Sequence, residues 1–136
     1  MPARGESPLR LVHPASGRVL ASRLERPRTF FGRGLGLMFR RGLAPGEGMW
    51  IAPCNGIHTF FMRFPIDVVF LDRGQRVVRV YPALRSWRLI PLVLGARSVV
   101  ELPGGTLEQL ALPRGEQMAV ERSRAGDAAG TGDRPG

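Results

Sequence analysis

Residues 66–71 read IDVVFL, and this stretch decides the fold. It is rich in β-branched and aromatic residues and apolar on both alternating faces, which is typical of a strand buried inside a sheet. The sequence DRGQ at 72–75 follows it and predicts a turn into a second strand at 76–81, with Gly74 free to adopt a positive φ. We therefore expect a hairpin whose first strand is central and paired on both sides.

Shorter strand candidates lie on both sides of this hairpin. Residues 9–12 and 18–22 flank a loop suited to a hairpin, residues 98–102 and 117–121 are further candidates, and PRG at 113–115 predicts the turn before the last one.

Helical patterns are few. Residues 29–41 predict a short helix or an irregular loop, and residues 106–110 predict a short helix with a threonine cap. The chain is therefore predicted to be mainly β: a single small β-sandwich or open barrel of short, mostly antiparallel strands with one or two short helices.

The length of 136 residues allows one domain. We expect a flexible N-terminus at 1–8, a single β-rich domain at 9–121 and a disordered tail at 122–136, which is small, polar and without periodicity. The longest uncharged apolar segment, at 89–96, is far shorter than the ~20 residues of a membrane helix, and the opening residues hold no signal-peptide core. We expect a cytoplasmic protein without membrane insertion.

Composition excludes several kinds of site. All 20 basic residues are arginines, so sites that need a lysine ammonium group, such as P-loops and Schiff bases, are absent. The single cysteine, Cys54, excludes intrachain disulfides and zinc sites built on paired cysteines. His13 and His58 are too far apart for a helical metalloprotease pair. We expect no metal and no cofactor.

The net charge of +9 is concentrated in the body of the chain, since residues 10–97 hold 15 arginines against four acidic residues. Such a field attracts anionic partners, although an arginine-rich composition alone also accounts for it. Trp87, between two arginines, is able to stack a base or to cover the core under a loop. The arginines of the candidate basic surface, which would bind an anionic partner, are Arg73, Arg76, Arg79, Arg85 and Arg88.

Asp67 is the residue most strongly indicated as part of a site. It lies in a strand that is apolar on both faces, so its buried carboxylate needs donors: backbone amides, Arg63 four residues earlier, or a ligand. We hypothesise that Asp67 fixes the corner at Pro65 and presents one oxygen to a pocket; the alternative is a purely structural role. Glu101 is a similar single acid in an apolar strand.

The stretch CNGIH begins at Cys54 and ends at His58, which suggests a thiol nucleophile with its base. However, Asn55-Gly56 is a strong two-residue hairpin signal that would place Cys54 opposite Ile57. Strand alternation would then point Cys54 and His58 to opposite sides. We interpret Cys54 as a structural or spectator thiol.

Four stretches together resemble one known family: GLMFR at 36–40, GMWIAPC at 48–54, IHTFFMRFPIDVVFLD at 57–72 and VELPGGT at 100–106. In order and over about residues 20–121, they resemble the domain-of-unknown-function family 192, an uncharacterised and mostly bacterial and archaeal group. The resemblance implies a mainly β fold with short helices and no established activity.

The resemblance also implies site residues. The family's recurring polar positions fall on Arg40, Asp67 and Glu101, beside the Gly-Gly-Thr turn at 104–106, whereas Cys54 with His58-Thr59 resembles a subset of the family.

The leading interpretation is a non-enzymatic domain that binds an unknown small ligand or protein partner. An enzyme that uses Asp67 as general base or Cys54 as nucleophile is the alternative, and an RNA- or phosphate-binding basic surface is the third. The candidate ligand-binding residues are Arg40, Arg63, Asp67 and Glu101, with Cys54, His58 and Thr59 as secondary candidates.

Overall fold

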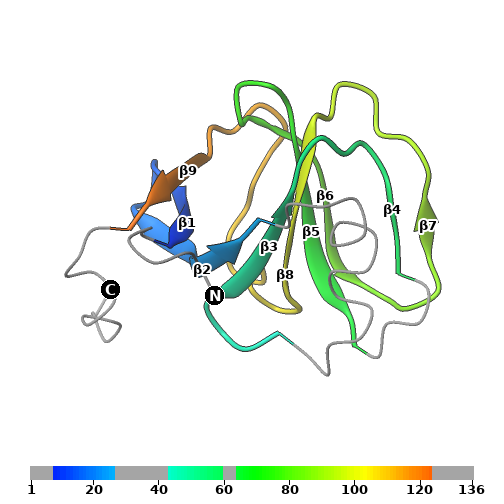
Figure 1. Ribbon diagram of the computed structural model, residues 1–136, viewed down its shortest axis with the longest axis horizontal. Coiled ribbons are helices and arrows are strands. Elements are labelled where there is room, and N and C mark those ends of the chain that lie inside the picture. Colours follow the sequence, from blue (N-terminus) through cyan, green and yellow to red (C-terminus); the bar gives the residue numbers. More distant parts are fainter. Residues whose placement is uncertain (1–7, 27–42, 60–63, 124–136) are drawn as a thin grey trace.

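The computed structural model describes residues 8–26, 43–59 and 64–123, which form nine β-strands (Figure 1). The strands are β1 (Leu9–His13), β2 (Arg18–Glu25), β3 (Glu47–Ile51), β4 (Ile57–His58), β5 (Ile66–Leu71), β6 (Val77–Leu84), β7 (Leu89–Ile90), β8 (Ser98–Pro103) and β9 (Ala119–Arg122).

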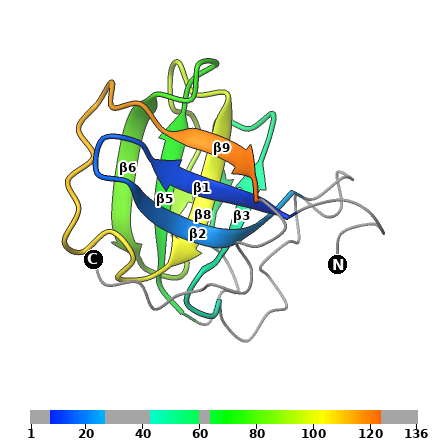
Figure 2. The same cartoon turned by 90° about the vertical axis from the view of Figure 1, so that its left-hand side faces the viewer.

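Seven strands form one sheet in the order β6-β5-β8-β3-β2-β1-β9, and β4 pairs with β7 in a separate two-stranded sheet. Every pair is antiparallel except β2 with β3. The large sheet curls, so that β9, β1 and β2 cross in front of β6, β5, β8 and β3 (Figure 2). This confirms the predicted fold class, a mainly β open barrel of mostly antiparallel strands.

Strand β5 is buried along its whole length and pairs with β6 at one edge and β8 at the other, as predicted. Because side chains alternate along a strand, β5 contributes to two separate cores. Val69 and Leu71 point into what we call the first core, whereas Ile66, Val68 and Phe70 point into the second.

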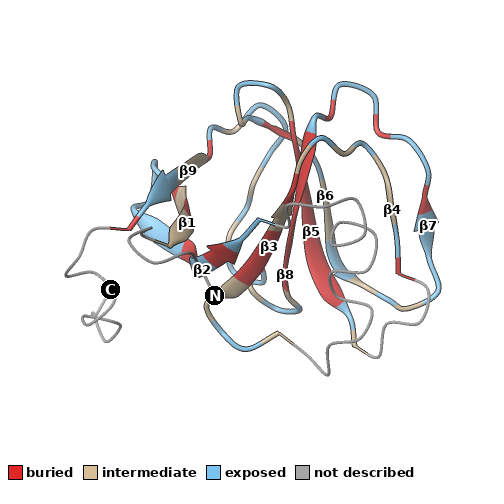
Figure 3. Cartoon of the chain, viewed as in Figure 1, coloured by how far each residue is buried: buried red, intermediate tan, exposed pale blue. Residues whose placement is uncertain are grey.

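The two cores lie on opposite faces of the central strands. The first fills the inside of the curl, and the second lies under the segment that contains β7; buried positions gather along β3, β5 and β8 in Figure 3. The other buried members of the first core are Leu11, Leu20, Ala21, Leu24, Val77, Val100, Leu102, Leu107 and Met118. Those of the second are Met49, Ile51, Ile90, Val93, Ala96 and Val99.

The hairpin predicted at Asn55-Gly56 is wrong. Strand β3 pairs with β2 and β8, while β4 pairs with β7. The Asn55 carbonyl instead accepts the Val93 amide at 2.8 Å. Glycine is required at 56 because a Cβ there would lie 2.5 Å from the Pro91 carbonyl oxygen. Packing against the segment around Pro91 overrides the local turn signal.

The hairpin between β5 and β6 is present as predicted, but Gln75 and not Gly74 adopts a positive φ, of 66°. The Asp72 side chain fixes this turn, because its Oδ1 accepts the Gly74 amide at 2.8 Å and the Arg76 amide at 2.9 Å. The predicted hairpin of β1 with β2 is also confirmed.

No helix occurs in the three described ranges. The helix predicted at 106–110 is a run of turns, in which the Leu110 amide donates to the Leu107 carbonyl three residues earlier. The predicted helix or loop at 29–41 lies outside the described residues, as do nearly all of the two chain ends predicted at 1–8 and 122–136.

We expect Gly56→Ala to lower the free energy of unfolding by about 1–3 kcal/mol, because the new methyl group meets the backbone carbonyl oxygens of Ile90 and Pro91. Gly74→Ala is the matched control, since its Cβ would meet nothing closer than 3.6 Å. Urea denaturation of both variants measures the difference. Equal stability of the two variants would show that the close approach at Gly56 does not constrain the fold.

Candidate functional site

The Asp67 carboxylate is 1% exposed, and all its hydrogen-bond donors among the described residues are backbone amides. Its Oδ1 accepts the Ala83 amide at 2.8 Å and the Gly105 amide at 3.3 Å, and its Oδ2 accepts the Leu107 amide at 2.8 Å. These donors come from the end of β6 and from the loop that follows β8. Asp67 therefore joins two loops to the start of β5.

Backbone amides were one of the three kinds of donor predicted for Asp67, and they occupy both of its oxygens. Among the described residues, the geometry therefore supports the structural role and gives no support to Asp67 as general base. Arg40 and Arg63, predicted to share its site, lie outside the described residues.

Asp67 and Glu101 lie on opposite faces of the sheet. In the pairing of β5 with β8, Asp67 faces Leu102, and Val68 faces Glu101. Leu102 belongs to the first core and Val68 to the second. The structure thus does not bring the two predicted acids together into one site.

Glu101 lies in the middle of the apolar face of the second core. It is 6% exposed, and Met49 of β3 and Val68 of β5 are its cross-strand neighbours. Within the described part of the chain, no donor is hydrogen-bonded to its carboxyl group. Burial raises the pKa of the Glu101 carboxyl group from its ordinary value of 4.5 to about 7.

Thr59, a secondary candidate, is buried, and its hydrogen bonds link two segments of the chain. Its Oγ1 donates to the Arg85 carbonyl at 2.7 Å and accepts the Arg88 amide at 2.8 Å, while its own amide donates to the Arg88 carbonyl. These bonds hold the loop between β6 and β7 against the residue that follows β4.

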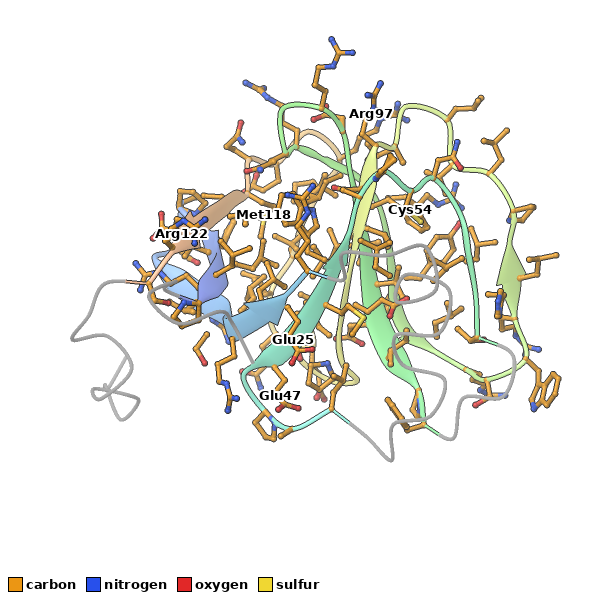
Figure 4. The ribbon with its side chains drawn as sticks, viewed as in Figure 1. Glu25, Glu47, Cys54, Arg97, Met118 and Arg122 are labelled. Atoms are coloured by element: carbon orange, nitrogen blue, oxygen red, sulfur yellow. The ribbon has the colours of Figure 1, made fainter. Side chains whose placement is uncertain are left out.

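Cys54, another secondary candidate, is half-buried and packs against the second core. Its Sγ donates to the Gly56 carbonyl at 2.9 Å, and its amide donates to the carbonyl of Arg97, which lies beside it in Figure 4. His58 is exposed on β4. Cys54 and Ile57 do not face each other across a hairpin, so the alternation argument for the directions of Cys54 and His58 is wrong.

The sequence did not indicate a trio of polar side chains centred on the buried His13. His13 is 5% exposed; its Nδ1 bonds Ser16 Oγ at 2.7 Å, and its Nε2 bonds Glu116 Oε2. The only local signal was that His13 shares the inward face of β1 with Leu11. Glu116 is 103 positions away in sequence.

This trio has the composition of a hydrolase triad but not its surroundings. The amides of Ser16 and Gly17 both donate to the His13 carbonyl, and the Arg18 amide donates to Ser16 Oγ. The neighbouring amides are therefore not available to stabilise an oxyanion. The trio joins the β1–β2 turn to the loop before β9.

The arginines predicted to form a basic surface for an anionic partner are all exposed: Arg73, Arg76, Arg79, Arg85 and Arg88. The described residues contain no group of three His, Cys, Asp or Glu side chains placed to hold a metal ion. The same residues hold no helix with the length and apolar character needed to cross a bilayer.

Comparison with known proteins gives a family but no activity. The family model DUF192, described as an uncharacterised ACR, matches residues 11–120. A UPF0127 protein of Thermococcus sibiricus is 34% identical over 125 residues, which is 85% of this chain and 78% of the relative. A UPF0127 protein of Pyrococcus horikoshii is 36% identical over 96 residues, 66% of this chain and 80% of the relative.

Two crystal structures share the fold. One, of a protein of unknown function from Novosphingobium aromaticivorans, has a TM-score of 0.70 at 25% identity and covers 88% of this chain and 89% of its own. The other, of a putative transcription regulator from Sinorhizobium meliloti, has a TM-score of 0.70 at 22% identity and covers 88% and 97%. At that identity the second likeness shows the fold alone.

We expect Asp67→Asn to lower the free energy of unfolding by about 1–3 kcal/mol. An amide has one acceptor oxygen, so its NH2 group faces a buried backbone N–H whichever way it is turned. Urea denaturation measures the loss, with the exposed Glu108→Gln as control. A loss no larger than that of the control would refute the role of Asp67 as the joint between the two loops.

We expect the stability difference between the wild-type protein and Glu101→Gln to depend on pH. The pKa of Glu101 is higher in the folded than in the unfolded state, so its contribution is greatest below pH 4.5 and falls as pH rises through about 7. The difference between these pKa values corresponds to roughly 3 kcal/mol. Urea denaturation at a series of pH values tests this, and parallel pH profiles for the two proteins would contradict it.

Proposed function

We propose that this chain, which belongs to the uncharacterised DUF192 family, is a non-catalytic cytoplasmic domain that binds a small ligand at the Glu101 carboxyl group. One observation carries the proposal: a carboxyl group buried in an apolar face with no hydrogen-bond donor among the described residues.

Ionising a carboxyl group in an apolar interior costs several kcal/mol, and the rise in the pKa of Glu101 reflects this cost of burial. A hydrogen-bond donor or a cation brought to the group would recover part of this free energy. Asp67 makes the contrast clear, since that buried acid accepts three backbone amides from the end of β6 and the loop after β8.

The residues around Glu101 limit the rest of the ligand. Its cross-strand neighbours Met49 and Val68 are apolar, and so is Val99 two positions along β8. An apolar body with one cationic or donor group matches this arrangement, because apolar surface supplies affinity and the single polar group sets orientation. We infer a small organic amine as the ligand class.

A second candidate function is general acid–base catalysis by Glu101. A carboxyl group with a pKa of about 7 is suited to proton transfer at neutral pH. In this enzyme alternative Glu101, and not Asp67, is the acid–base group. Chemical conversion of a bound compound by the wild-type protein, absent in Glu101→Gln, would favour it over binding alone.

Isothermal titration calorimetry with benzylamine, and with uncharged benzyl alcohol as its analogue, tests the binding proposal. We expect benzylamine to bind the wild-type protein roughly tenfold or more tightly than it binds Glu101→Gln, a difference of about 1.4 kcal/mol or more. Proton release should accompany binding near pH 7, because a cation favours the ionised carboxylate.

Glu108→Gln is the control, since it removes an exposed carboxylate of the same type and should bind benzylamine as the wild-type protein does. Equal binding of benzylamine by the wild-type protein and Glu101→Gln, or equal binding of the amine and the alcohol, would reject Glu101 as the recognising group.

A further inference from the structure

Among the described residues, the exposed large apolar side chains lie almost entirely in one short segment, residues 87–94. Trp87 is 57% exposed, Leu89 60%, Leu92 57% and Leu94 78%, and among the described residues only Val19, on β2, is a further case. Scattered exposed apolar residues are common, but four within eight positions form a patch. We call these four side chains the β7 patch.

The β7 patch is held on a fixed backbone. Ile90, Val93 and Ala96 turn inward to the second core, so the residues between them are directed outward. The Val93 amide donates to the Asn55 carbonyl and the Arg97 amide to the Leu71 carbonyl, both at 2.8 Å. This segment follows the outer edge of the molecule, at the right of Figure 1. The patch is therefore a built projection and not a frayed end.

The charge around the patch has one sign. Residues 73–100 contain six arginines and no acidic residue. Arg85, Arg88 and Arg97 lie within three positions of the patch and are exposed. The nearest acids along the chain are Asp72, which accepts two backbone amides in its turn, and Glu101, which is buried.

We propose that the β7 patch docks on the surface of an anionic lipid bilayer. Leucine side chains favour the acyl region, tryptophan favours the interface, and arginines favour the phosphate layer, and this segment presents all three together. The contact is peripheral, made by a strand and its flanking loops that lie on the leaflet.

A nucleic-acid partner would explain fewer of the exposed side chains of the β7 patch than a lipid bilayer does. Phosphates would bind the arginines and a base would stack on Trp87, but the three exposed leucines would have no apolar partner. The exposed leucines therefore favour a lipid bilayer over nucleic acid as the partner of the β7 patch. The docking surface does not involve Glu101, and its existence does not depend on the proposed ligand site.

Vesicle co-sedimentation of the full chain tests the proposal, with vesicles of phosphatidylglycerol and phosphatidylcholine in equal parts and vesicles of phosphatidylcholine alone. We expect binding to the anionic vesicles that weakens with salt. The variant Leu92→Ser with Leu94→Ser should reduce partitioning by roughly tenfold or more. Arg85→Gln with Arg88→Gln should reduce it mainly at low salt.

Val19→Ser is the matched control, because it removes an exposed apolar side chain far along the chain, on β2, and should leave vesicle binding unchanged. Glu101→Gln should also bind vesicles as the wild-type protein does, which separates this proposal from the ligand site. In a Trp50→Phe background Trp87 is the sole tryptophan, and its emission should move to shorter wavelength when anionic vesicles are added.

Four results would overturn the proposal. The first is the absence of binding to anionic vesicles, and the second is unchanged binding in the double leucine variant. The third is arginine-dependent binding to an RNA oligonucleotide with no vesicle binding, which would reassign the surface to nucleic acid. Loss of a dimer in the leucine variant, with no vesicle binding by the wild-type protein, would reassign it to self-association.

Discussion

Strand β5 buries side chains on both of its faces, and the rest of the fold provides the two covers that this requires. Each face would otherwise leave a strip of Val, Ile, Leu and Phe in water, at about 25 cal/mol per Å² of apolar surface. The curl of β2, β1 and β9 covers one face. The segment from β7 to β8, tied to the stretch before β4, covers the other. A flat sheet would leave the first of these two faces uncovered.

The two buried acids show how this two-sided arrangement gives two similar side chains different surroundings. Asp67 and Glu101 occupy adjacent strands at positions offset by one residue, and that offset directs them to different cores. Asp67 accepts three backbone amides, one from the end of β6 and two from the loop after β8, whereas Glu101 meets only apolar side chains among the described residues. The same carboxyl group is thus hydrogen-bonded to three backbone amides at Asp67, whereas at Glu101 its burial among apolar side chains raises its pKa.

The sequence was sufficient for features set by local chemistry. The apolar run at 66–71 and the turn at 72–75 define a hairpin, and the pattern of short strands and turns predicted the fold class, with which the family resemblance agrees. Features that depend on pairing between distant segments were beyond it. The faces of Asp67 and Glu101 depend on the register of β5 with β8, and the role of Gly56 depends on its contact with Pro91. The bond between His13 and Glu116 had no local signal at all.

The edge of the large sheet has a consequence for synthesis of the chain. Strand β1 is made first, but its second partner, β9, is made last, and the Ser123 amide closes the pair on the Pro8 carbonyl at 2.8 Å. Until β9 leaves the ribosome, β1 presents an unpaired edge that is able to pair with other chains. Closing that edge requires contact across more than a hundred residues, which is a slow step in folding. A chain interrupted before residue 119 would therefore keep most of its core sequence but expose an aggregation-prone strand.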